Sequence, residues 1–174
     1  SGIYDSASLQ VWDEQLVAIG EKIFKKRKKF IEEFLLLFVK FYKFITDEEE
    51  TAAINYESQL EGNDFSTLLK NALQKDRALQ FTTTGIHKDD LNFTISGVSA
   101  KKFGSQGQQK SYVIALKLAH FATIKKHKNI RPLVMFDDLF DKLDDNRVSK
   151  ILNMVHDDIF GQVFITDTHS ERLK

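Results

Sequence analysis

A short polar loop near the middle of the chain has the composition of a phosphate-binding turn. The segment KFGSQGQQK holds Gly104, Ser105 and Gly107 and runs into a long amphipathic stretch, predicted to be a helix from Ser105 to about Lys128. Glycine leaves backbone amides uncovered, and the first amides of a helix have no partner inside it. The loop can therefore bind a phosphate group, although Ser105 can also be an ordinary N-cap.

A pair of carboxylates follows a short linker later. The apolar run PLVMF predicts a buried strand from Pro132 to Phe136, which delivers Asp137 and Asp138 at its carboxyl end. α/β sheets bind ligands at that end, where one acid can orient Mg²⁺ and the second can polarise an attacking water molecule. A plain polar turn after a core strand is the alternative interpretation.

Further acids follow this strand in the segment LFDKLDDNR. Asp141 falls in a loop, and Asp144 or Asp145 is expected to cap a helix that runs to about Asp158. Capping a helix is compatible with a role in a functional loop, so both interpretations stay open.

A second buried strand is predicted at residues 162–166, QVFIT. Strand, helix and strand at this spacing predict a parallel pair with a right-handed crossover. The carboxyl ends of parallel strands share one sheet edge, so His169 would lie at the same edge as Asp137.

The N-terminal part of the chain is predicted to be a helical arm. Apolar residues recur at steps of three and four from Leu9 to about Ile45 with no proline between them, which predicts one long helix or two stacked helices. Gly20 is its weak point, at a cost of about 1 kcal/mol against alanine. We divide the chain into this arm, residues 1–50, and a second part, residues 51–174.

A run of five positive charges lies within the arm. It is either a solvated helix flank or a patch that contacts DNA phosphates, because clustered lysine and arginine side chains release counterions when they bind DNA. The run consists of Lys25, Lys26, Arg27, Lys28 and Lys29.

The segment after the arm is predicted to mix extended and helical structure. Residues 52–60 are expected to be extended, and Asp64 or Ser66 can cap a helix from Phe65 to about Leu79.

Two segments rich in β-branched and aromatic residues come next. Residues 81–85 and 91–95 are predicted strands, and the turn signal Ser96-Gly97 predicts a hairpin just before the glycine loop. His87 lies between the two strands and is expected to be a solvent-exposed loop residue.

Composition sets the broad class. The chain has 174 residues, 42% hydrophobic and 29% charged, as in an ordinary globular protein with room for one sizeable core. It has no cysteine, which suits a reducing compartment, and we expect a cytoplasmic protein. No apolar run approaches the roughly 20 residues of a membrane span, so no membrane association is expected. The net charge is zero, so any nucleic-acid contact must come from local patches.

One motif is missing from the sequence. There is no G-x-x-x-x-G-K-[ST] motif and no Gly-Lys pair, so the chain cannot hold β- and γ-phosphates by a P-loop. A candidate phosphate loop and an acidic strand without a P-loop are what half of an enzyme would contain.

These motifs, in this order, resemble the C-terminal part of the RecF family of ABC-type ATPases, which are related to SMC proteins. The resemblance rests on FGSQGQQKS, PLVMFDDLFDKLD and GQVFITDT, together with TTTGIHKDDLNFTISG and the arm segment VWDEQLVAIGEKIFKKRKKF. It covers nearly the whole chain. Ile86 and Lys88 depart from it, because the family has proline and arginine there.

The resemblance assigns roles to individual positions. Gly104, Ser105, Gln106, Gly107 and Gln108 correspond to the signature loop, which contacts the γ-phosphate of ATP held by the opposite subunit. Asp137 corresponds to the Walker B acid that takes Mg²⁺, and Asp138 to the catalytic acid. Asp141, Leu143 and Asp144 correspond to the D-loop, and Asp167 or His169 to the switch residue.

The resemblance also implies a fold and a function. The expected fold is α/β, a partial ABC-type ATPase head with parallel strands, crossover helices and a β-hairpin, plus an N-terminal helical arm. The Walker A region would lie upstream, so the fragment alone is expected to be inactive and to hold no ligand. The full-length protein would bind ATP and Mg²⁺ as an ATP-dependent homodimer.

The implied biological setting is DNA replication, recombinational repair and the SOS response. The implied partners are gapped DNA or junctions of single-stranded and double-stranded DNA, RecR, and indirectly RecO and RecA, which would be loaded. Two alternatives remain. One is a self-contained metal-dependent phosphohydrolase or nuclease that uses Asp137, Asp138, Asp141 and Asp144, and the other is a non-catalytic, SMC-like interaction module.

Overall fold

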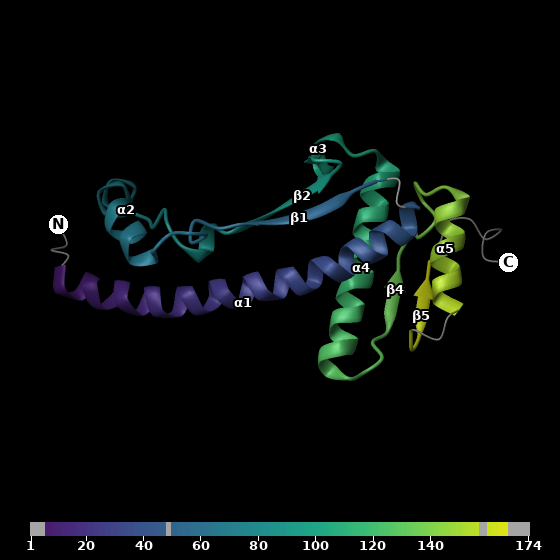
Figure 1. The fold of residues 1–174 in the computed structure, drawn as a ribbon, viewed down its shortest axis with the longest axis horizontal. Coiled ribbons are helices and arrows are strands. Elements are labelled where there is room, and N and C mark those ends of the chain that lie inside the picture. The colour runs from purple at the N-terminus through teal and green to yellow at the C-terminus, as the bar shows by residue number, and fades with distance from the viewer. Residues whose placement is uncertain (1–5, 48–49, 157–159, 167–174) are drawn as a thin grey trace. The chain divides into compact units, whose positions relative to one another are not determined.

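The computed structural model describes residues 6–47, 50–156 and 160–166, and the fold is mixed α/β (Figure 1). Its elements in chain order are α1 (Ser6–Thr46), β1 (Ala52–Glu57), α2 (Phe65–Leu79), a 3₁₀ turn (Ile86–Lys88), β2 (Asp90–Ile95), β3 (Val98–Ser99), α3 (Ala100–Phe103), α4 (Gln106–Lys128), β4 (Val134–Phe136), α5 (Asp145–His156) and β5 (Val163–Ile165).

The strands form two separate sheets. One has the order β1-β2-β3, in which β2 and β3 pair antiparallel through the predicted hairpin. In the other, β4 and β5 pair parallel, with Met135 opposite Phe164. The parallel pair joined by a helix is therefore confirmed.

The arm is one continuous helix rather than two stacked ones, because α1 runs unbroken through 41 residues (Figure 1). It contributes to two compact units of the chain. The first unit comprises Ser1–Glu32 and Asn55–Asn92, and the second comprises Glu33–Ile54 and Phe93–Lys174. The boundaries of these units differ from the division at residue 50 that the sequence suggested.

The first unit has a small core around Phe65. This side chain and those of Leu60 and Leu69 are buried, and Val17 and Phe24 of α1 pack against them. Of the two predicted caps of α2, Asp64 rather than Ser66 is the N-cap, and its carboxylate accepts a hydrogen bond from the Thr67 amide at 2.7 Å.

One strand prediction in this unit is wrong. Residues 81–85, predicted as a strand, form a loop. Asp76 accepts hydrogen bonds from the Thr83 amide and hydroxyl, at 2.9 and 2.6 Å, and Gln59 accepts one from the Gly85 amide at 3.0 Å. Side chains thus satisfy the backbone amides that a neighbouring strand would otherwise bind.

The second unit contains the larger core. An aromatic cluster joins α1 to α4, since the rings of Phe38 and Tyr112 lie 4.6 Å apart and Tyr42 packs against both. The Tyr112 hydroxyl donates a hydrogen bond to the Ala53 carbonyl at 2.7 Å, and burial raises the pKa of this phenol.

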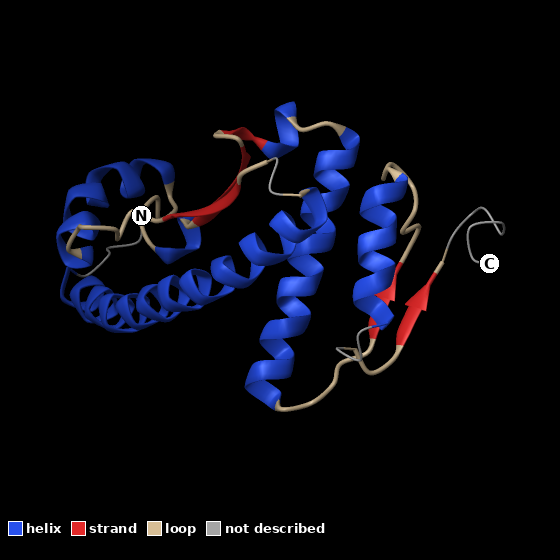
Figure 2. Cartoon of the chain, turned by 45° about the vertical axis from the view of Figure 1, so that its right-hand side comes forward, coloured by secondary structure: helices blue, strands red, loops and turns tan. Residues whose placement is uncertain are grey.

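Helix α5 lies alongside the strand pair β4–β5 in both views (Figure 2). Ile151 and Met154 of α5 belong to the same buried cluster as Val134 and Phe136 of β4, so α5 covers the face of the sheet to which these two strand residues point.

Within the residues that the structure describes, every helix is too short or too polar to span a lipid bilayer.

Gly20 provides a test of the packing in the first unit. A β-carbon at Gly20 would lie 2.5 Å from Cε1 of Phe65, a ring that is buried. We expect Gly20→Ala to lower the free energy of unfolding, because overpacking costs about 1–3 kcal/mol and exceeds a gain in helix propensity of about 1 kcal/mol. Urea unfolding of the chain measures the difference.

The matched control is Ala18→Gly, at an exposed position of the same helix. It should cost about 1 kcal/mol through helix propensity alone. A higher urea midpoint for Gly20→Ala would show that helix propensity, not the contact with Phe65, decides this position.

Candidate functional site

The start of α4 is capped, but two of its backbone amides have no partner within the helix. Ser105 is the N-cap, and its hydroxyl oxygen accepts a hydrogen bond from the Gln108 amide at 3.2 Å. The Gln108 side chain in turn accepts one from the Ser105 amide at 2.8 Å, which completes a capping box. The amides of Gln106 and Gly107 lie between these two and have no carbonyl one turn earlier in the helix to bind. These two amides are the ones that can receive an anion.

A side chain at either glycine of the loop would meet a backbone carbonyl oxygen. A β-carbon at Gly104 would lie 2.5 Å from the carbonyl oxygen of Ala100. A β-carbon at Gly107 would lie 3.0 Å from the carbonyl oxygen of Lys142. The glycine loop therefore packs directly against the loop that holds Asp141 and Asp144.

The two carboxylates after β4 are at the predicted sheet edge. The Thr166 hydroxyl, just past β5, donates a hydrogen bond to Oδ1 of Asp137 at 2.5 Å and accepts one from the Asp138 amide at 3.1 Å. Both acids are exposed, and Asp138 has a left-handed backbone with φ of 47°. The ends of the two parallel strands thus hold an exposed acidic turn in a defined conformation.

Lys110 connects this acidic turn to α4. Its ammonium group donates a hydrogen bond to the carbonyl of Asp138 at 2.8 Å and a longer one to the carbonyl of Asp137 at 3.5 Å. Sequence reasoning missed Lys110, because the contact depends on how α4 packs beside β4 and not on any local pattern.

The loop from Asp141 to Asp144 ends in a helix cap. Asp144, rather than Asp145, caps α5, since its Oδ1 accepts a hydrogen bond from the Arg147 amide at 2.9 Å. The Asp141 carboxylate lies 3.5 Å from the ammonium group of Lys142, and Leu143 is partly buried against the core.

The metal prediction at Asp137 and the switch prediction stay predictions. The described residues contain no group of three or more histidine, cysteine, aspartate or glutamate side chains placed to share a metal ion. Asp167 and His169, the predicted switch residues, lie outside the described residues.

The positively charged run on α1 divides into two sets, and the first is structural. The guanidinium of Arg27 donates hydrogen bonds to Asp89 at 2.8 Å and to the carbonyl of Ile86 at 2.7 Å. Tyr56 donates to the same oxygen of Asp89 at 2.5 Å, and the Asp89 side chain is only 4% exposed. The hydrogen bond that Arg27 donates to Asp89 raises the pKa of Arg27. Lys28 pairs with Glu61 at 2.6 Å.

The second set is exposed to solvent. Among the described residues, Lys25, Lys26 and Lys29 form no hydrogen bond or ion pair, and neither does Lys22. These four lysines follow the spacing i, i+3, i+4 and i+7, so they lie on one face of the helix. We call this set the lysine face.

His87 has a local role in the same unit. It is exposed, and its Nε2 lies 2.9 Å from the Thr82 carbonyl, within the loop that replaces the predicted strand.

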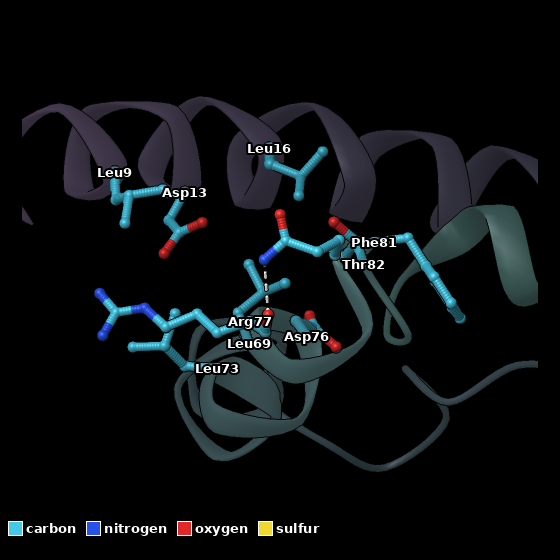
Figure 3. Close-up of a pocket in the computed structure, with 10 residues that line it drawn as sticks. Leu9, Asp13, Leu16, Leu69, Leu73, Asp76, Arg77, Phe81 and Thr82 are labelled. Carbon is cyan, nitrogen blue, oxygen red and sulfur yellow. Dashed lines mark hydrogen bonds between the residues drawn. The ribbon is translucent and has the colours of Figure 1, made fainter. Parts of the chain in front are cut away.

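A pocket that sequence reasoning missed lies between α1 and α2 of the first unit (Figure 3). Its volume is about 240 Å³, and it combines apolar side chains with the charged groups of Asp13 and Arg77. In the close-up, residues of α1 line one side and residues of α2 the other. The labelled lining residues are Leu9, Asp13, Leu16, Leu69, Leu73, Asp76, Arg77, Phe81 and Thr82.

Solved structures define the class of fold. A structure described as the recombination mediator protein RecF-ATP in the RecFOR pathway superposes with a TM-score of 0.79 at 25% identity, over 98% of this chain and 47% of that one. A second, described as RecF-ATPrS, gives 0.78 at 24% identity over 97% of this chain and 47% of that one, and it supports the fold alone. The fold is that of an ABC-type ATPase. No protein-family model matches the chain.

Curated relatives define the family. The DNA replication and repair protein RecF of Flavobacterium johnsoniae is 52% identical over 169 residues, which cover 97% of this chain and 47% of the relative. RecF of Bacteroides thetaiotaomicron is 44% identical over 94% of this chain and 44% of the relative. This chain belongs to the RecF family, as its motifs predicted, and it spans about half the length of the curated relatives it matches.

Proposed function

We propose that this chain forms the signature-loop half of the ATPase head of a DNA replication and repair protein. The observation that carries the proposal is the start of α4, where the amides of Gln106 and Gly107 are available and Gly107 lies against the loop of Asp141. In the full-length dimer, Ser105 and Gly107 would contact the γ-phosphate of ATP held by the opposite subunit.

The acidic turn suits the metal that accompanies ATP. Carboxylate oxygens are the ligands that Mg²⁺ prefers, and Asp137 and Asp138 are both exposed at the sheet edge. We assign Asp137 to hold Mg²⁺ and Asp138 to act on the attacking water. Thr166 orients Asp137 by its hydrogen bond, and Lys110 holds the backbone of the turn against α4.

The parallel sheet supports the interpretation as half of a head. Parallel sheets are normally covered on both faces. Here α5 covers one face, whereas Met135 and Phe164, which are opposite each other in register, are 67% and 50% exposed on the other. We infer that another part of the full-length protein covers these two side chains.

Titration of the isolated chain tests this division. Because the sequence has no P-loop, we expect isothermal titration with Mg-ATP to show no binding in the micromolar range. Micromolar binding, or metal-dependent cleavage of DNA by the isolated chain, would instead support a self-contained phosphohydrolase or nuclease.

Substitution of Ser105 in the full-length protein tests the contact across the dimer. Ser105→Arg places a bulky side chain at the amides of the helix start, so we expect it to abolish ATP-dependent dimerisation measured by light scattering. ATP binding by the separate subunits should be unchanged.

Ser105→Thr is the control, because threonine keeps the N-cap and should keep ATP-dependent dimerisation. If Ser105→Arg still dimerises with ATP as the unmodified protein does, the signature-loop role is wrong, and an SMC-like interaction module without this contact becomes the better interpretation.

We further propose that the lysine face of α1 contacts DNA. Its members are exposed, whereas Arg27 and Lys28 are occupied by Asp89 and Glu61. Gapped DNA or junctions of single-stranded and double-stranded DNA would be the substrates, and RecA loading would be the outcome. RecR and RecO would be the partners, as the RecFOR pathway named for the structural neighbours suggests.

Charge reversal tests the lysine face in the full-length protein. Replacing Lys25, Lys26 and Lys29 by glutamate should weaken DNA binding and reduce the salt slope, log K against log salt, by up to about 2.7 if each contacts one duplex phosphate. Fluorescence anisotropy over a range of salt concentrations measures both quantities.

The control carries the same change of charge elsewhere, at the exposed residues Lys75, Lys126 and Lys128. An equal loss of affinity in this control would mean that net charge, and not the lysine face, decides DNA binding.

A further inference from the structure

The side chain of Arg147 connects three segments of the second unit. It lies in the first turn of α5, and 16% of it is exposed. Nη1 donates a hydrogen bond to the Ser111 hydroxyl at 3.0 Å, and Nη2 donates one to Glu50 at 3.3 Å. Nε lies 3.2 Å from Asp144. Each nitrogen of one planar group thus reaches a different segment.

Two of these partners belong to the candidate ATP site. Ser111 is fully buried on α4, five residues after Gln106. Asp144 ends the loop that packs against Gly107, and a β-carbon on Gly107 would lie 3.8 Å from Nη1 of Arg147. Arg147 therefore lies directly behind the amides proposed to meet the γ-phosphate.

The third partner leads to α1. The other carboxylate oxygen of Glu50 accepts a hydrogen bond from the Tyr42 hydroxyl at 2.5 Å. Tyr42 is fully buried near the C-terminal end of α1, and burial together with Glu50 raises its pKa, so the phenol remains a donor. The path from Tyr42 through Glu50 to Arg147 is continuous in hydrogen bonds.

We propose that Arg147 is a positioning residue that couples the end of α1 to the signature loop, residues 104–108, and to the loop of Asp141–Asp144. The coupling rests on the proposed function, since it sets the geometry in which a second subunit meets these loops. Three directed bonds from one guanidinium require its planar fork, which the compact ammonium of lysine cannot replace.

The test uses full-length protein and compares Arg147→Lys with Tyr42→Phe. Tyr42→Phe removes only the hydroxyl and keeps the ring in the aromatic cluster. The Tyr42 hydroxyl bonds to Glu50 and not to either loop. We expect Arg147→Lys to weaken ATP-dependent dimerisation about tenfold and Tyr42→Phe to weaken it severalfold, with the ATP affinity of separate subunits unchanged. The double variant should be no weaker than Arg147→Lys alone, because both changes break one path.

Asp64→Ala is the control for stability, since it removes the N-cap of α2 in the first unit. It should lower the melting temperature and leave dimerisation unchanged. Additive effects in the double variant, or normal dimerisation by Arg147→Lys and Tyr42→Phe while Ser105→Arg fails to dimerise, would overturn the coupling and leave the proposed function intact. If the unmodified protein does not dimerise with ATP, both are wrong.

Discussion

A single guanidinium group, that of Arg147, connects three segments of the second unit. It lies between two carboxylates and a buried hydroxyl, and each of its three nitrogens has a partner. Removing one member of such a group leaves a charge without its partner at a poorly solvated site, which costs far more than the pair itself contributes. This arrangement adds directed bonds between α4, α5 and the residues after α1, which also share one hydrophobic core.

The same physical rule organises the first unit at smaller scale. Arg27 is held by Asp89, which Tyr56 also binds, and this set joins α1 to the segment after the 3₁₀ turn. Neighbouring lysines on α1 have the same charge, but their direction from the helix leaves them in water. Chemical type alone therefore does not separate a residue that stabilises the fold from one that is available to a partner. The residues that surround each side chain in the folded structure decide which of the two roles it has.

Much of the fold could be predicted from local patterns. The cap at Ser105, the helix that follows, the hairpin at Ser96 and the parallel pair β4–β5 were all predicted, because short-range signals determine them. The segment 81–85 was predicted wrongly as a strand, since Asp76 and Gln59 satisfy its backbone from elsewhere in the chain. Gly20 looked like a defect of the helix, whereas its missing side chain makes room for Phe65.

The sequence by itself determined the family, the order of the motifs and the residue types of the candidate site, because these are properties of the chain read in order. Only the tertiary structure decided which amides at the start of α4 have no partner in the helix, which positive charges of α1 are occupied, and that Lys110 and Arg147 contact the candidate site. Those facts depend on contacts between residues far apart in sequence: Lys110 meets the backbone of Asp138, and Arg147 meets Glu50. No local pattern encodes a distance between two such atoms, so only packing brings them together.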